Sequence, residues 1–325
     1  MQVEMEADRW GTCYARFRYM AKRNVVIGDR DIELLLALDR CPLTPSQLRK
    51  LSDSFPQPFS DEHTLRRRLR LIADVGFIAS WPYAVASDGQ SPHYYRLTRD
   101  GFKLLHGMDV ALPSRRQFQA LATGHHHHTQ SLADFLVHTI VSAHQHNVTV
   151  QHVAPENSIR LEASGFVLYP DLAFQVVTPD GRTFHFILEL DNGTERVRST
   201  RDVESIERKL RGYDAHQSRF SANDPDRYLV LFITTRGSQR LQHMLDLAGS
   251  VMTNPQRTVF VGSDLKSWIN GDPFKETLLI DHRGLKRSLI PPDALLRKKF
   301  CQHTTAMADL RKSDAGLLAP ASVQC

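Results

Sequence analysis

A turn sequence at residues 178–182 lies between two short, strongly apolar segments, and this pattern predicts a β-hairpin. Pro179 suits the second position of a type I turn, and Gly181 can supply the left-handed residue that closes a three-residue loop. Such a loop pairs Thr178 with Arg182, so residues that lie opposite each other have numbers with a constant sum. The turn therefore fixes the register of both strands.

Three carboxylates gather on one patch of this predicted hairpin. The register places Asp171 directly opposite Glu189, about 5 Å apart, where like charges are destabilising. Asp191 shares the face of Glu189 because strand side chains alternate with a period of two. A divalent cation would neutralise the cluster, since hard cations take carboxylate oxygens. The alternative is that acidic residues at strand ends simply face water.

The segment from Thr200 to Gln217 is predicted to be a helix, because apolar residues recur at helical spacing. Lys209 and Tyr213 are four residues apart on the flank of this apolar stripe. Lys209 is therefore expected to reach back toward the carboxylates. The next segment, 227–235, is a continuous apolar run typical of a central strand covered on both sides.

The order of these motifs resembles the PD-(D/E)XK nuclease-like fold. More narrowly, it is similar to the replication-relaxation family of plasmids and other mobile elements, in which a winged helix precedes such a domain. The resemblance covers roughly residues 28 to 235, and the motifs that carry it are Tyr169-Pro170-Asp171, the run from Glu189 to Glu195, and Lys209-Leu210-Arg211-Gly212-Tyr213.

The resemblance implies a metal-dependent phosphodiester chemistry. Asp171, Glu189 and Asp191 would hold Mg²⁺ or Mn²⁺, with Asp191 helping or orienting the attacking water, and Lys209 would stabilise the scissile phosphate. His128 and Tyr213 are candidate accessory residues. Asp191 stands where the usual Glu-x-Lys motif has its lysine, and Lys209 is the natural substitute. For the acidic residue that many such nucleases carry on their first helix, the only nearby candidates are Asp134 and Glu156.

The N-terminal third has the element order of a winged helix-turn-helix. The pattern predicts helices from 29, 45 and about 61, then two short strands around a polar loop, then a helix from 99. The third helix of such a fold reads the major groove. Its outward positions are predicted to be arginines, a residue suited to guanine edges and phosphates: Arg66, Arg67, Arg68 and Arg70. An arginine-rich face is also common on helices that are merely solvated, and winged helices also serve as protein-interaction modules.

The whole composition is compatible with these expectations. A net charge of +5 suits a nucleic-acid partner without requiring one. Four scattered cysteines argue against a zinc ribbon and a disulfide framework. We expect a soluble, cytoplasmic protein, because no stretch approaches a membrane span. No phosphate-binding Gly-rich loop is present, so a nucleotide cofactor is not expected. The histidines at 125–128 are expected to begin a helix and point in different directions, which disfavours a metal site made by the run itself.

The predicted fold class is α/β (α+β overall), with a restriction-endonuclease-like mixed sheet flanked by helices in the second domain. The expected boundaries are an arm at 1–27, a winged helix-turn-helix at 28–110, a linker at 111–125, a PD-(D/E)XK nuclease-like domain at 126–295 and a C-terminal extension or tail at 296–325. The sequence leaves oligomerisation open.

Three functions are consistent with these observations. The first is a DNA-binding protein of a mobile genetic element, acting in plasmid replication, relaxation or transfer, with a metal-dependent nuclease-like domain that acts on phosphodiester bonds. The DNA partner is expected to be double-stranded. The second is a non-catalytic DNA-binding regulator or replication accessory factor with a degenerate nuclease fold. In the third, the second domain serves dimerisation or partner docking and the carboxylates are incidental.

Overall fold

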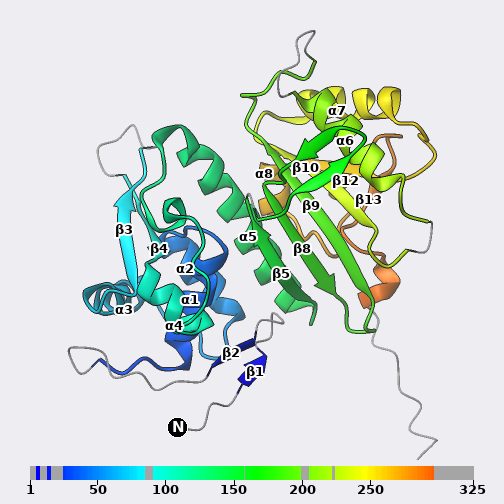
Figure 1. The fold of residues 1–325 in the computed structure, drawn as a ribbon. Helices are drawn as coiled ribbons and strands as arrows, with labels where there is room; N and C mark the ends of the chain where they lie inside the picture. The colour runs from blue at the N-terminus through cyan, green and yellow to red at the C-terminus, as the bar shows by residue number, and fades with distance from the viewer. Residues whose placement is uncertain are drawn as a thin grey trace, which may run out of the picture.

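The structure is a computed structural model that describes residues 5–7, 13–15, 25–84, 91–156, 158–198, 205–221 and 224–295 (Figure 1). The expected tail at 296–325 and the loop of the predicted wing at 85–90 lie outside these residues, as does most of the predicted N-terminal arm. Within the arm, the backbones of β1 (Met5–Ala7) and β2 (Cys13–Ala15) pair antiparallel.

Residues 25–106 form the N-terminal lobe. The expected order of three helices, a hairpin and a closing helix is confirmed: α1 (Asp29–Arg40), α2 (Pro45–Leu51), α3 (Glu62–Asp74), β3 (Ile78–Pro82), β4 (His93–Leu97) and α4 (Arg99–His106). Thr44 caps α2 through its side chain, which accepts from the Gln47 N–H, and Gln47 bonds back to the Thr44 N–H. Gly76 follows α3 with φ of 87°, a conformation that favours glycine.

A larger lobe is built on a seven-stranded mixed sheet in the order β13-β12-β11-β10-β9-β8-β5. Its elements, in chain order, are α5 (His126–Gln145), β5 (Thr149–Pro155), β6 (Leu161–Ala163), β7 (Phe166–Leu168), β8 (Leu172–Val177), β9 (Thr183–Asp191), α6 (Ile206–Gln217), β10 (Tyr228–Thr234), α7 (Ser238–Val251), β11 (Phe260–Asp264), α8 (Leu265–Asn270), β12 (Leu279–Asp281) and β13 (Lys286–Arg287). Strands β9, β10 and β11 run parallel, and β8 pairs antiparallel with β9.

Helices cover both faces of this sheet. On β9, Leu188 and Leu190 belong to one buried cluster together with residues of α5 and α8. Ile187 belongs to a second cluster with residues of α6 and α7. Because strand side chains alternate, Glu189 and Asp191 lie on the face of Ile187, under α6 and α7. The central strand β10 is buried on both faces, as its continuous apolar run predicts.

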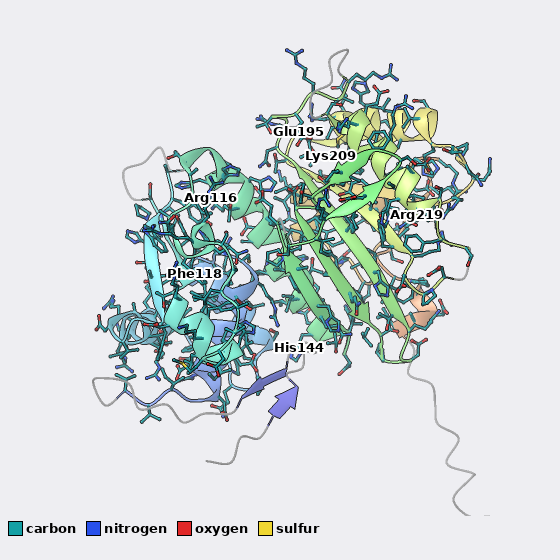
Figure 2. All side chains as sticks on the ribbon, in the orientation of Figure 1. Arg116, Phe118, His144, Glu195, Lys209 and Arg219 are labelled. Atoms are coloured by element: carbon teal, nitrogen blue, oxygen red, sulfur yellow. The ribbon has the colours of Figure 1, made fainter. Side chains whose placement is uncertain are left out.

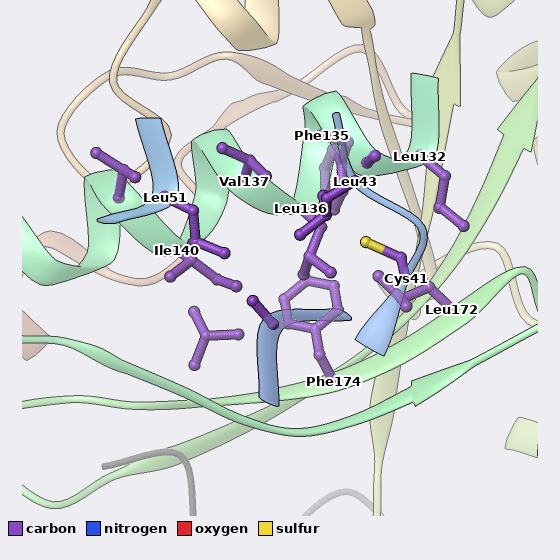
Figure 3. Close-up of a cluster of buried hydrophobic side chains, with 14 of the residues drawn as sticks. Cys41, Leu43, Leu51, Leu132, Phe135, Leu136, Val137, Ile140, Leu172 and Phe174 are labelled. Carbon is purple, nitrogen blue, oxygen red and sulfur yellow. The ribbon is translucent and has the colours of Figure 1, made fainter. Parts of the chain in front are cut away.

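Helix α5 joins the two lobes, which lie on either side of it (Figures 1 and 3). Its buried side chains Phe135, Leu136 and Ile140 contribute to one hydrophobic core with Leu51 of the N-terminal lobe and Phe174 of the sheet. Burying a leucine or phenylalanine contributes about 1.5–3 kcal/mol. The shared core therefore fixes the N-terminal lobe against the sheet.

Several strands have no counterpart in the sequence expectations: β5, β6, β7, β12 and β13. All of them except β5 have three residues or fewer. Strand β5 is longer, but its pairing with β8 has a break in register between Gln151 and Ala154. Short or interrupted strands give little periodic signal. The start expected for α6 at Thr200 lies outside the described residues. The segment expected as a linker at 111–125 contains two 3₁₀ turns, Arg115–Phe118 and Thr123–His125.

Candidate functional site

Asp171 and Glu189 face each other across β8 and β9. The register pairs Leu172 with Leu188, so the next residues outward are opposite, and the Thr178 N–H donates to the Arg182 carbonyl at 3.0 Å in the connecting turn. The register predicted from the turn is confirmed. The Leu190 N–H donates to Asp171 Oδ2 at 2.7 Å. Two carboxyl groups are therefore held together at the end of the hairpin.

Helix α6 brings two polar side chains onto Glu189. Lys209 Nζ lies 2.9 Å from Glu189 Oε2 and 2.8 Å from Glu195 Oε1, and the Tyr213 hydroxyl donates to Glu189 Oε1. Residues four apart share one face of a helix, which explains why both reach the same carboxylate. The expected reach of Lys209 is thus confirmed. Figure 2 shows Lys209 and Glu195 next to each other at one end of the sheet.

Burial sets the protonation of this cluster. Burial raises the pKa of Glu189 to about 7, reinforced by Asp171 and opposed by Lys209 and Tyr213. Burial works to lower the pKa of Lys209, but the charges of Glu189 and Glu195 outweigh it and hold that pKa above its ordinary value. Burial raises the pKa of Tyr213 well above its usual value. At neutral pH the lysine is charged, the tyrosine is a proton donor, and Glu189 holds its proton more tightly than an exposed glutamate does.

Asp191 lies on the same face but is bound by different partners. Arg240 of α7 donates from Nε to Asp191 Oδ2 at 2.6 Å and from Nη2 to Oδ1 at 2.8 Å. Thr234 Oγ1 and the Gly193 N–H add further hydrogen bonds. Burial works to raise the pKa of Asp191, but Arg240 and Thr234 outweigh it, and the pKa is lowered. Both oxygens of Asp191 are therefore engaged by the protein.

Glu195 is part of a motif of the family resemblance but was not predicted as a site residue, and the structure shows that it shares Lys209 with Glu189. Its Oε2 atom is buried and has no hydrogen-bond partner among the described residues. Its backbone carbonyl accepts from Arg240 Nη2 at 2.7 Å, so the loop after β9 is attached to both α6 and α7. Its place six residues after Glu189 was the signal that could have identified it.

The histidine run divides into separate roles, as expected for adjacent helical residues. His128 Nε2 lies 3.3 Å from Asp171 Oδ1, a contact whose geometry falls short of a hydrogen bond. Burial works to lower the pKa of His128, but Asp171 outweighs it and the pKa is raised. His126 is buried in the N-terminal lobe, where its Nδ1 accepts from the Ala84 N–H at 2.7 Å. The first-helix candidate Asp134 accepts from Gln47 Nε2 at 2.7 Å, at the junction of the lobes.

The arginines of α3 do not form one exposed row. Arg66, Arg67 and Arg70 are exposed, and Arg66 also donates to Glu62 at 2.8 Å. The expectation that Arg68 points outward is wrong: it donates to Asp31 Oδ1 at 2.6 Å and to the Val26 carbonyl at 2.6 Å. Position 68 flanks the apolar stripe of α3, and from there its side chain reaches Asp31 at the start of α1.

The carboxylate pair can be compared with the two common kinds of divalent-cation site in proteins, a cluster of protein ligands alone and a pair of carboxylates completed by water and phosphate. In the part of the chain that the structure describes, no group of three His, Cys, Asp or Glu side chains is arranged to hold a metal ion. Mg²⁺, however, is usually bound by one or two carboxylates together with water and substrate phosphates. Asp171 and Glu189 fit a site of that kind, because each carboxylate oxygen can accept more than one partner. Asp191 is not part of that pair, because the hairpin register places Asp171 opposite Glu189, and Arg240 neutralises Asp191 through two hydrogen bonds.

The model of the replication-relaxation family matches residues 37–225, which is more than half of the chain. The chain therefore belongs to the replication-relaxation family, whose members are associated with the replication or relaxation of plasmids and other mobile elements. The matched span contains the carboxylate pair and Lys209 and ends before Arg240. No curated protein and no solved structure matches the chain. No described helix is long and apolar enough to cross a membrane.

Proposed function

We propose that this protein binds duplex DNA through its N-terminal lobe and cleaves phosphodiester bonds at the Asp171–Glu189–Lys209 cluster, during replication or relaxation of a plasmid or other mobile element. The N-terminal lobe acts as a winged helix-turn-helix within residues 28–110, and residues 126–295 act as a PD-(D/E)XK-like domain. The observation that carries the proposal is the 2.9 Å contact between Lys209 Nζ and Glu189 Oε2, beside the facing carboxylate of Asp171.

The DNA-binding part of the proposal is supported by α3. Arg67 and Arg70 are exposed on this helix, beside the partly exposed pair of Arg66 and Glu62. Arginines on one exposed helix face can contact phosphates and guanine edges. The hairpin of β3 and β4 would be the wing, placed next in the chain after α3.

In the chemistry we propose, Asp171 and Glu189 would hold Mg²⁺ or Mn²⁺, and the bound ion would supply polarisation of the phosphate and a lowered pKa of a water molecule. Lys209 places a positive charge where negative charge develops on the phosphate. Tyr213 orients Glu189 by donating to Oε1, and His128 flanks Asp171. Glu189 must lose its proton to act as a ligand, so its raised pKa makes the site sensitive to pH near neutrality.

The test is cleavage of supercoiled plasmid, linear duplex and single-stranded DNA with magnesium, manganese or chelator. Glu189→Gln keeps the shape of the side chain and removes its charge, and Glu162→Gln is the matched control on an exposed carboxylate in the same lobe. We expect cutting by the parent and by Glu162→Gln, and none by Glu189→Gln, with DNA affinity unchanged in both variants. A Glu189→Gln protein that cuts as fast as the parent would contradict the assignment.

A second candidate function is a non-catalytic DNA-binding regulator or replication accessory factor. The observation that favours it is the closed ion-pair network, in which Arg240 occupies Asp191 and Lys209 bridges Glu189 and Glu195. Protein cations then neutralise the carboxylates without a metal. Tight DNA binding with no cutting in any metal would favour this function over the first.

A further inference from the structure

A basic pocket of about 520 Å³ lies beside Asp191, outside the carboxylate pair. It is lined by Gly193, Arg236, Gln239, Arg240 and His243, and no carboxylate lines it. Arg240 and His243 are three residues apart in α7 and therefore share one face of the helix, while Arg236 lies in the loop just before it and lines the same pocket. The pocket therefore presents hydrogen-bond donors and positive charge to solvent.

The Arg236 side chain occupies a position that is open only because residue 193 is a glycine. Its Nε donates to the Asn192 carbonyl at 2.6 Å, and its side chain lies flat against Gly193. A Cβ on Gly193 would come within 2.7 Å of Arg236 Nε, and Gly193 also has φ of 75°. Arg236 makes no ion pair with a carboxylate among the described residues. The loop thus holds a guanidinium whose charge is available to an anion.

The chemistry of the lining selects a phosphate group. Arginine matches phosphate oxygens with a planar fork of donors. The lining offers no apolar wall for a nucleobase, whereas pockets for small molecules are mostly apolar. A phosphate that belongs to a polymer therefore suits this open pocket better than a free nucleotide.

The pocket is connected to the carboxylate pair through β9. Asp191, which binds Arg240, is two residues beyond Glu189 on the same face, roughly 7 Å along the strand. That spacing corresponds to about two nucleotides of rise along one DNA strand. Both features lie at the carboxyl ends of the parallel strands β9 and β10, the edge at which α/β sheets usually bind ligands.

We propose that Arg236, Gln239, Arg240 and His243 form a binding subsite for a backbone phosphate of the DNA strand that enters the carboxylate site. In this arrangement Asp191 is a positioning residue that orients Arg240. The inference rests on the proposed DNA binding but does not require cutting.

The test measures binding of the full-length protein to labelled duplex and single-stranded DNA in chelator, over a series of salt concentrations. The background is Arg67→Ala/Arg70→Ala, which reduces the expected contribution of α3. Arg236→Ala should weaken binding about fivefold to tenfold and make the slope of log K against log salt shallower by about 1. Gly193→Ala keeps every charge but displaces Arg236, and should weaken binding similarly in protein whose melting temperature shows it to be folded.

Arg182→Ala is the matched control, because it removes the same charge at the opposite end of β9. If Arg182→Ala weakened DNA binding as much as Arg236→Ala does, the effect would come from the total charge of the protein, and the inference would be overturned. Unchanged binding by Arg236→Ala would overturn it as well. Inorganic phosphate or a mononucleotide that binds the parent but not Arg236→Ala, with DNA affinity equal in both, would assign the pocket to a free phosphate instead. Failure of the parent to cut in magnesium would affect only the proposed nuclease activity, since binding is measured in chelator.

Discussion

Arg240 binds Asp191 through two hydrogen bonds, from Nε to Oδ2 at 2.6 Å and from Nη2 to Oδ1 at 2.8 Å. The Asp191 side chain is 2% exposed and that of Arg240 is 22% exposed. The two residues are 49 positions apart, so the pair links the end of β9 to the start of α7. Paired bonds of this kind are among the strongest in proteins.

Because Asp191 is more deeply buried than Arg240, removing either residue should lower the free energy of unfolding by a different amount. Arg240→Ala leaves a buried carboxylate without its cation, and we expect the free energy of unfolding to fall by about 3 kcal/mol. Asp191→Ala leaves an arginine that can reach water and should cost less. Urea denaturation of both single variants and the double variant measures this. If the double variant lost the sum of the single losses, the two residues would not be coupled.

The raised pKa of Glu189 predicts a specific dependence of stability on pH. The folded state holds a proton on Glu189 up to about pH 7, whereas the unfolded chain loses it near pH 4.5. The contribution of this group to stability is therefore full below about pH 4.5 and is lost as pH rises to about 7. Compared with Glu189→Gln, the parent should lose stability across this window by at most about 1.4 kcal/mol per pH unit. If the melting temperatures of the parent and of Glu189→Gln changed with pH in the same way, the predicted contribution of Glu189 would be contradicted.

The arginines of α3 should separate into two kinds. Arg68→Ala leaves the buried Asp31 without a charged partner, and we expect a loss of about 1–3 kcal/mol in the free energy of unfolding. Arg67→Ala and Arg70→Ala should change stability by no more than about 0.5 kcal/mol. These two variants should instead weaken DNA binding and make its salt dependence shallower. Denaturation and binding titrations on the same preparations distinguish the groups, and a stable Arg68→Ala protein with impaired DNA binding would reverse the assignment.

The reactivity of the buried Cys41 thiol can be used to measure opening of the core of the N-terminal lobe. Burial raises the pKa of its thiol to about 12, so at pH 8 only about one molecule in 10⁴ carries the thiolate. In a variant with Cys13, Cys301 and Cys325 replaced by serine, a thiol reagent should react very slowly until denaturant opens the lobe. Labelling in native buffer at the rate of a free cysteine would show that this core is open.

Local chemistry was enough to predict the central features of the site. The turn at 178–182 set the register that brings Asp171 opposite Glu189, because a hairpin loop constrains both strands directly. The four-residue spacing of Lys209 and Tyr213 predicted that one helix face would carry both. The sequence also predicted the apolar stripe of α3, but it did not show how far the buried face extends on either side of that stripe. Arg68, at the edge of the stripe, was therefore wrongly predicted to face solvent.

What the sequence alone determined is therefore short-range: the hairpin, the helix order of the N-terminal lobe and the strand face that carries the carboxylates. Only the tertiary structure decided that β10 lies parallel to β9 and that Arg240 binds Asp191. It also decided that Asp31, at the start of α1, lies within reach of α3 and binds Arg68. Turns and periodic patterns act within a few residues, where the chain itself limits the geometry. The pairing of parallel strands and the packing of distant helices depend on how the whole chain buries its apolar surface, and no local pattern specifies that.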